Sequence, residues 1–103
     1  MASAKLEVFE LETVEMAAFA RALSHPARIE ILKILAKSEE LACMAIVRHL
    51  PLSQPACSRH IHELVKAGLL SSRSKGSNVF FKLNKSALDR FCAGMNTSLH
   101  AIT

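Results

Sequence analysis

The stretch from Leu52 to Leu70 constrains the fold most, because it predicts one helix with both of its ends marked. Ser53 can cap the N-terminus, since a serine hydroxyl accepts a hydrogen bond from an unpaired N–H of the first turn. Pro55 follows in that first turn, where its missing N–H is tolerated. Gly68 stands where a residue in the left-handed conformation commonly ends a helix. The sequence therefore predicts a helix over residues 54–67.

This helix has an apolar face and a polar face. The apolar side chains recur at i, i+4, i+7 and i+8, which places them on one side of a helix: Cys57, Ile61, Leu64 and Val65. Polar side chains that can bond base edges and phosphates occupy the opposite side and its N-cap, and we expect them to contact DNA in the major groove: Ser53, Gln54, Ser58, Arg59, His62 and Lys66. An ordinary solvated surface helix is the alternative on this evidence alone.

A β-hairpin is predicted directly after this helix, over residues 70–83. Leu69–Ser74 is short and extended, Lys75–Asn78 has turn chemistry, and Val79–Leu83 is rich in β-branched and aromatic residues. A basic hairpin in this position predicts a wing that lies along the phosphate backbone. Its candidate DNA contacts are Arg73, Lys75, Asn78 and Lys82.

The rest of the chain predicts further helices. Apolar residues indicate a first helix over residues 9–23, and Ser24 is expected to cap a second helix whose isoleucines and leucines are apolar nearly all round. Leu41 and Ala42 can form a short strand, residues 43–50 predict a third helix ended by Pro51, and Asn84 or Ser86 caps a last helix. We therefore predict one α+β, mostly α, domain over residues 1–103: a winged helix-turn-helix of about five helices plus a hairpin.

The positive charge of the chain is concentrated in one segment. The net charge is +4, but residues 53–85 carry six lysines and arginines against one glutamate, whereas residues 1–23 carry two basic residues against four acidic ones. A basic patch confined to one segment indicates a polyanionic partner such as double-stranded DNA. The alternative is a basic protein with a random excess of charge.

Assembly with a second copy is indicated by surplus apolar residues. Half of the residues are hydrophobic, which is generous for a chain of 103 residues and suggests apolar surface buried against another subunit. The last helix carries an apolar stripe at helical spacing, and we expect it to form a homodimer interface with apolar residues of the first helix. The expected interface residues are Leu11, Val14, Phe19, Leu88, Phe91, Cys92, Met95 and Leu99.

The cellular compartment is predicted to be the cytoplasm, with no membrane as partner. No apolar run approaches the roughly 20 residues that span a bilayer, and no secretory signal pattern is visible at the N-terminus. The three cysteines form no C-x-x-C motif, and their odd number fits reduced thiols better than a disulfide framework.

Three segments in order resemble the ArsR/SmtB family of bacterial winged-helix repressors: residues 22–28, 52–56 and 63–70. The similarity covers about residues 9–100. It implies a homodimer built on the first and last helices, and operator binding by the helix over 54–67 and the hairpin over 70–83. It also implies a signal, because many members release DNA when a metal ion binds and some sense thiol oxidation.

The usual metal ligands of that family are missing here. The thiolate pattern Glu-Leu-Cys-Val-Cys reads Glu-Leu-Ala-Cys-Met from Glu40, so Ala42 and Met44 stand at the ligand positions. In the last helix Asp89 is followed two residues later by Phe91 rather than His. His49, His60 and His62 are spread over two helices, so we expect solvated or DNA-facing histidines. We predict no metal and no cofactor, because a closed zinc site usually needs four ligands.

The cysteines leave two possibilities open. Cys43, Cys57 and Cys92 are candidates for a redox role, which requires a low thiol pKa and access to solvent. A buried cysteine otherwise behaves as a small hydrophobe. Control by abundance or by another ligand is an equally good alternative to thiol sensing.

No enzymatic pattern is visible. Ser58, His60 and Asp89 are not spaced to meet as a triad, and the chain has no glycine-rich phosphate loop and no paired carboxylates. The predicted function is therefore a DNA-binding transcriptional repressor. The alternative is a winged-helix module that binds other proteins and no specific DNA.

Overall fold

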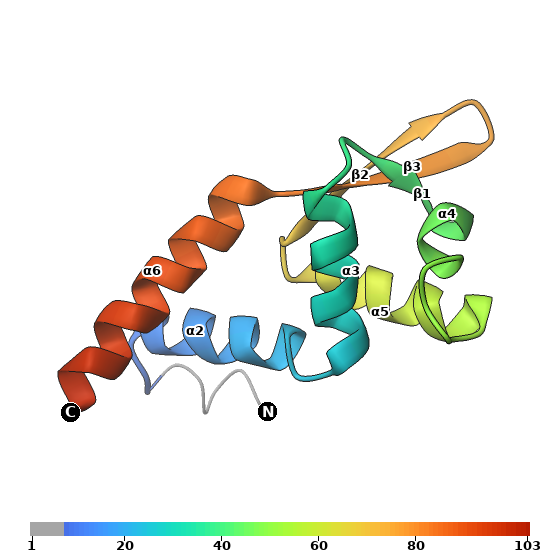
Figure 1. Ribbon diagram of the computed structural model, residues 1–103. Coiled ribbons are helices and arrows are strands. Elements are labelled where there is room, and N and C mark those ends of the chain that lie inside the picture. Colours follow the sequence, from blue (N-terminus) through green and yellow to red (C-terminus); the bar gives the residue numbers. More distant parts are fainter. Residues whose placement is uncertain (1–7) are drawn as a thin grey trace.

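The computed structural model describes residues 8–103, and within this range it contains five helices and three strands (Figure 1). The elements in chain order are α2 (Leu11–Ala22), α3 (Pro26–Ala36), β1 (Leu41–Ala42), α4 (Cys43–Val47), α5 (Gln54–Lys66), β2 (Leu70–Lys75), β3 (Asn78–Leu83) and α6 (Lys85–Ile102). The predicted fold class, an α+β winged helix-turn-helix, is confirmed. No helix among these residues is long and apolar enough to cross a membrane.

Helix α5 begins and ends as its sequence predicts. The Ser53 hydroxyl accepts a hydrogen bond of 3.3 Å from the Ala56 N–H and so satisfies one unpaired donor of the first turn. The helix ends at Lys66, one residue before the predicted end, and Gly68 follows with φ +83°, a conformation that a side chain with a Cβ rarely adopts. Cys57, Ile61 and Leu64 are buried, as the apolar face requires.

Helix α3 begins at Pro26, and its cap is His25 rather than the predicted Ser24. The Nδ1 atom of His25 accepts a 3.0 Å hydrogen bond from the Ala27 N–H, whereas the Ser24 hydroxyl donates backwards to the Arg21 carbonyl at 2.6 Å. The difference arises because Pro26 takes the first position of the helix, where its missing N–H is tolerated, and this leaves the extended His25 as the capping residue.

The sheet has the order β1-β3-β2, with both pairs antiparallel. Leu41 pairs with Phe81, which confirms the short predicted strand at residues 41–42. The hairpin runs from the Leu70–Leu83 pair to the Lys75–Asn78 pair, and its two-residue turn contains Gly76 at φ +64°. Figure 1 shows this hairpin projecting away from the helices as a wing.

The core lies between α3, α4, α5, the C-terminal half of α2 and the base of the wing. Its fully buried members include Ile31, Leu35, Ile46, Ile61, Leu64 and Leu69. Helix α3 is less central than its sequence suggests, because Ile29 is 42% exposed. Helix α4 is also shorter than predicted: it ends at Val47, and single turns carry the chain through residues 48–50 to Pro51.

Helix α6 leaves the wing and runs beside α2, so that these two helices form one end of the molecule and the wing forms the other (Figure 1). The rings of Phe19 in α2 and Phe91 in α6 stack with centroids 5.0 Å apart. Asn84 caps α6 by accepting a 3.2 Å hydrogen bond from the Ala87 N–H, so Asn84 and not Ser86 takes the capping role.

Candidate nucleic-acid interface

The polar face of α5 is open to solvent along its whole length. The predicted contact residues that lie on it are all exposed: Ser53, Gln54, Ser58, Arg59, His62 and Lys66. Because α5 is held to the core by its opposite face, these side chains are presented on a rigid element. Such a face can enter the major groove without any loss of core packing.

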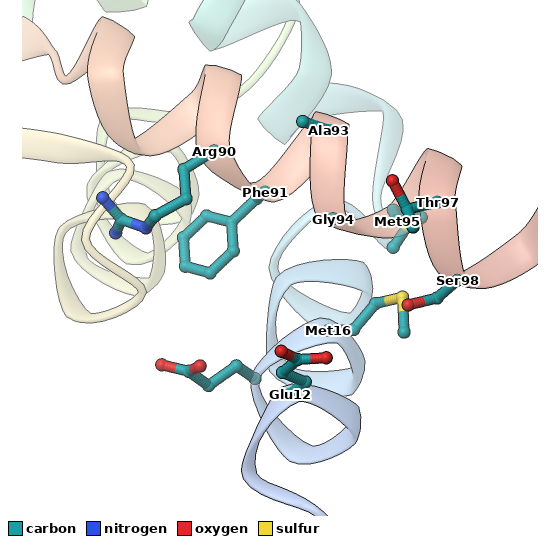
Figure 2. Close-up of a pocket in the computed structure, with 10 residues that line it drawn as sticks. Glu12, Met16, Arg90, Phe91, Ala93, Gly94, Met95, Thr97 and Ser98 are labelled. Atoms are coloured by element: carbon teal, nitrogen blue, oxygen red, sulfur yellow. The ribbon is translucent and has the colours of Figure 1, made fainter.

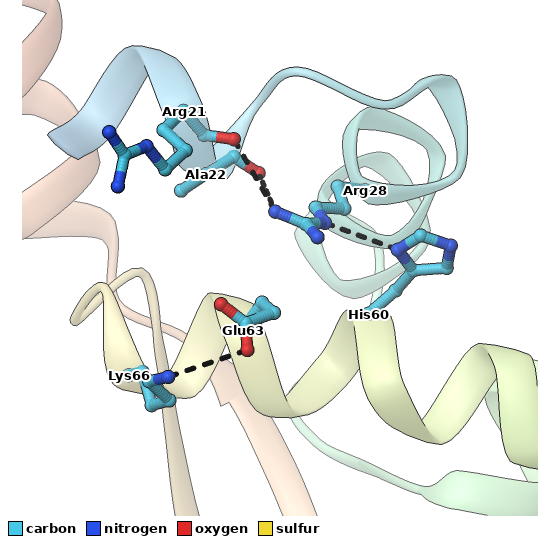
Figure 3. Close-up of polar contacts among 6 residues, drawn as sticks. All are labelled: Arg21, Ala22, Arg28, His60, Glu63 and Lys66. Carbon is cyan, nitrogen blue, oxygen red and sulfur yellow. Dashed lines mark hydrogen bonds and ion pairs between the residues drawn. The ribbon is translucent and has the colours of Figure 1, made fainter. Parts of the chain in front are cut away.

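Three of these side chains already have partners within the chain. The Ser53 hydroxyl caps the helix, and the Gln54 amide donates towards the Cys43 sulfur at 3.8 Å. Lys66 Nζ lies 3.5 Å from Glu63 Oε2, an exposed pair of small energetic weight (Figure 3). No side-chain hydrogen bond among residues 8–103 occupies Ser58, Arg59 or His62, which makes these three the most available for base edges.

The wing carries its charged side chains on the surface. Lys75, Asn78 and Lys82 are exposed, as is Arg73. Arg73 nevertheless has a strong partner within the protein, which its sequence position did not indicate. Its Nε donates to the two carboxylate oxygens of Glu40 at 2.8 and 3.1 Å, and its Nη2 also donates to Oε1.

This pair changes the electrostatics of the wing. The hydrogen bonds from Arg73 lower the pKa of Glu40; burial opposes this shift, and the charges of Arg73, Lys82 and Lys75 add to it. The Arg73 guanidinium also lies 5.6 Å from the centre of the Phe80 ring. Arg73 therefore reaches a phosphate only by sharing or leaving Glu40, whereas Lys75 and Lys82 need not give up such a partner.

His60 lies on α5 but turns towards α3, so it does not belong to the solvated or DNA-facing histidines that we expected. Its Nδ1 accepts a 3.1 Å hydrogen bond from Arg28 Nε (Figure 3). Its ring centre lies 4.3 Å from that of His25. Burial lowers the pKa of His60, and the charges of His25, Arg28 and Arg59 lower it further. The spacing gives a signal for this position, because residue 60 lies one turn from both Cys57 and Leu64 and so borders the core face.

The residues predicted for a dimer interface lie along α2 and α6, with different exposure. Leu11 is 71% and Leu99 51% exposed, Cys92 is exposed, and Val14, Leu88, Phe91 and Met95 are partly buried. Phe19 is only 3% exposed, because it packs inside its own chain. It therefore has little surface to offer a second subunit, contrary to expectation.

Two hollows flank α6 where it meets α2. One, of about 420 Å³, is lined by Glu12 and Met16 of α2 and by Arg90, Phe91 and Met95 of α6 (Figure 2). The other, of about 540 Å³, is lined by residues that include Phe19, Cys92 and Leu99. Unfilled apolar space on both sides of a terminal helix is typical of a surface that another chain covers.

The three cysteines lie in different surroundings. Cys57 is completely buried, and burial raises the pKa of its thiol, with a smaller contribution from Cys43. Cys43 is partly buried and Cys92 is exposed. A raised pKa reduces the thiolate fraction, so the environment of Cys57 is that of a packing residue rather than of a reactive thiol.

The potential metal ligands are scattered over the described part of the chain. Within residues 8–103 no three His, Cys, Asp or Glu side chains come together as a group that could hold a metal ion. Ser58, His60 and Asp89 also do not assemble, since His60 faces α3 and Asp89 is exposed on α6.

Known proteins are similar to this chain in sequence and in fold. Residues 23–73 match a family model described as a helix-turn-helix domain. The arsenical resistance operon repressor of Staphylococcus xylosus is 36% identical over 75 residues, which cover 73% of this chain and 71% of that protein. An ArsR-like transcriptional regulator from Rhodococcus sp. RHA1 is similar in structure, with a TM-score of 0.70 and 26% identity over 87% of this chain and 91% of that one.

A third similarity concerns the fold alone. A homodimeric winged helix-turn-helix DNA-binding domain from Mycobacterium bovis gives a TM-score of 0.69 at 22% identity, covering 84% of this chain and 80% of that one. The matched helix-turn-helix contains α3, α4 and α5, and the similarity to the staphylococcal repressor extends over about three quarters of the chain. The chain therefore belongs to the ArsR/SmtB family of winged-helix transcriptional regulators.

Proposed function

We propose that this chain represses transcription in a bacterial cytoplasm by binding operator DNA as a homodimer, and that it catalyses no reaction. One observation carries the proposal: the exposed polar face of α5 is followed directly by the hairpin that carries exposed Lys75 and Lys82. The chain that holds these two elements belongs to a family of transcriptional regulators. Repression is the function that the name of the staphylococcal relative states for that protein.

In this proposal α5 reads the base sequence and the wing binds the phosphate backbone. Gln54, Ser58 and Arg59 on the first two turns of α5 read base edges, because amide and guanidinium groups match the donor and acceptor patterns of the major groove. Lys75 and Lys82 bind phosphates beside the groove and set the orientation without reading sequence. Repression is then steric, since an occupied operator excludes polymerase.

The surface formed by α2 and α6 supports the homodimer. Leu11 and Leu99 expose large apolar side chains there, and unfilled space lies on both sides of α6. A second copy that covers this surface leaves α5 and the wing of both subunits free for DNA. Two recognition helices then enter successive major grooves about 34–36 Å apart.

The experiment is selection of duplexes from a random double-stranded pool by the purified protein, followed by titration of the recovered duplex at several salt concentrations. A repressor recovers a sequence with two related half-sites, and its binding constant falls steeply with salt because each phosphate contact releases counterions. A protein-binding module without specific DNA contacts recovers no sequence and shows no preference over a scrambled duplex. That second result would refute the proposed function.

A further inference from the structure

Arg28 in α3 connects the recognition helix to two other helices. Its Nε donates to His60 Nδ1 on α5 at 3.1 Å, and its Nη1 donates to the carbonyl oxygens of Arg21 and Ala22 at 3.4 and 3.5 Å (Figure 3). These two carbonyls lie at the C-terminal end of α2. One guanidinium thus joins the helix that we assign to DNA, the helix on which it stands and a helix that we assign to dimerisation.

The contact with His60 requires a neutral imidazole. In neutral histidine one ring nitrogen accepts and the other donates, whereas in the protonated ring both nitrogens donate. Nδ1 of His60 accepts from Arg28, so a proton there would set two donors against each other. His25 meets the same requirement, because its Nδ1 accepts from the Ala27 N–H at the start of α3.

The charges around His60 also oppose protonation. Burial is the largest cause of the lowered pKa of His60. The charges of His25, which caps α3, of Arg28 within α3 and of Arg59 beside it on α5 lower the pKa further. The side chain one turn further along α5 is Glu63, whose carboxylate lies beside Lys66. Among the described residues, no charge from α4 or the wing, which also pack on α5, shifts this pKa. A proton on His60 therefore adds a third positive charge beside two arginines.

We propose that Arg28 is a positioning residue for DNA recognition, which fixes α5 against α2 and α3 through neutral His60, and that protonation of His60 releases this hold. The inference rests on the proposed function and adds an acid-sensitive control to it. Arg28 touches no DNA in this proposal. It acts on affinity by keeping α5 at the angle at which its polar face fits the groove.

The test compares two asparagine variants of α5 in operator binding as the pH is lowered. His60→Asn places an amide oxygen near the position of Nδ1, so it can still accept from Arg28 but takes up no proton. His62→Asn is the matched control, because it removes a histidine from the exposed face of the same helix. Binding is measured by fluorescence anisotropy with the duplex recovered from the random pool, and helix content is followed by circular dichroism.

At about pH 8 we expect wild type and His60→Asn to bind with similar affinity, and near pH 5 we expect the wild type to bind about threefold more weakly than His60→Asn. His62→Asn should keep the acid-induced loss, since its His60 is intact. Arg28→Lys, which lacks the forked donor, should bind more weakly than wild type already at about pH 8.

Two outcomes would overturn the inference and leave the proposed function intact. In one, His60→Asn loses affinity on acidification as the wild type does. In the other, the ratio of wild-type affinity to His60→Asn affinity is the same at both pH values. If neither the wild type nor any variant binds a preferred duplex at any pH, the proposed function itself fails. A readout independent of DNA is the NMR titration of His60, whose pKa should lie below the ordinary histidine value in the wild type and rise in Arg28→Gln, which removes the positive charge beside the ring.

Discussion

Arg73 in the wing donates from Nε to the carboxylate of Glu40, the residue directly before β1, at 2.8 and 3.1 Å. The two residues are 33 positions apart in sequence, and the contact joins β2 to the residue that enters β1. The sequence predicts that the Arg73 guanidinium contacts a DNA phosphate, but in the structure its positive charge is paired with the carboxylate of Glu40. If the wing binds phosphates as we propose, Glu40 limits how much of its positive charge is available to DNA.

Replacing Glu40 should strengthen non-specific DNA binding. Glu40→Gln removes the charge that occupies Arg73, and we expect the slope of log affinity against log salt to become steeper by up to about one unit, the value of one added phosphate contact. Titrations with a scrambled duplex at several salt concentrations measure this slope. Glu39→Gln is the control, because it removes the same charge from the exposed neighbour.

The same pair gives a pH dependence with a defined sign. Arg73 lowers the pKa of Glu40 in the folded protein, so the contact stabilises the wing above the ordinary glutamate pKa of about 4.3 and is lost as the pH falls below it. The protection of the β2 amides, measured relative to intrinsic exchange at each pH, should therefore fall on acidification more in the wild type than in Glu40→Gln. An equal fall in both proteins would show that the pair does not hold the wing.

Arg59 and Lys75 should differ in the kind of binding that they support. Arg59→Ala on α5 should cost about 1–3 kcal/mol with the selected duplex and weaken the preference at one base position, if Arg59 reads a base edge. Lys75→Ala in the wing should weaken all duplexes alike and flatten the salt slope by about one unit. Unchanged affinity for both variants would place the interface elsewhere.

The dimer interface is best tested at a side chain that the single chain does not bury. Phe91→Asp would remove the stacking on Phe19 and so damage the fold as well as the interface. Leu99→Asp introduces a charge at a position that is 51% exposed in the chain, so we expect a folded monomer in sedimentation. Val79→Asp, on the wing at 43% exposure, is the matched control and should stay dimeric. A dimeric Leu99→Asp protein would exclude this part of α6 from the interface.

The thiols should react in the order of their exposure. Burial raises the pKa of Cys57, so we expect alkylation of the native protein at Cys92 first, at Cys43 more slowly, and at Cys57 only after unfolding. Mass spectrometry of peptides after timed treatment with iodoacetamide reports the order. Rapid modification of Cys57 in the folded protein would restore it as a redox candidate. A separate test replaces all three cysteines with serine: if an oxidant still releases this variant from DNA, thiol sensing is excluded.

Local features made the fold predictable, and long-range contacts limited the prediction of the site. Ser53, Gly68 and the alternation within residues 70–83 act through their near neighbours, so their structural consequences can be worked out from the sequence. The contacts of His60 with Arg28 and of Arg73 with Glu40 join residues 32 and 33 positions apart. Such partners follow only from how the elements pack, which is why His60 was expected in solvent and Arg73 without an intramolecular partner.

The prediction that Ser24 caps α3 was wrong for a different reason. The order Ser-x-Pro occurs at both Ser24 and Ser53, but the proline takes the first helical position in α3 and the second in α5. The capping residue therefore shifts by one. A shared local pattern fixed the presence of both helices but not the residue at which each one starts.

The stacking of Phe91 on Phe19 has a consequence for how the C-terminal helix keeps its order. In its 18 residues α6 fully buries one side chain, Ala87 in the first turn, and beyond Phe91 its turns meet open space on both flanks. A helix held so lightly in one chain takes much of its rigidity from whatever covers it. If a second copy covers this surface as we propose, the last turns of α6 should be more ordered at high protein concentration than at low concentration, whereas the order of α5 should be the same at both.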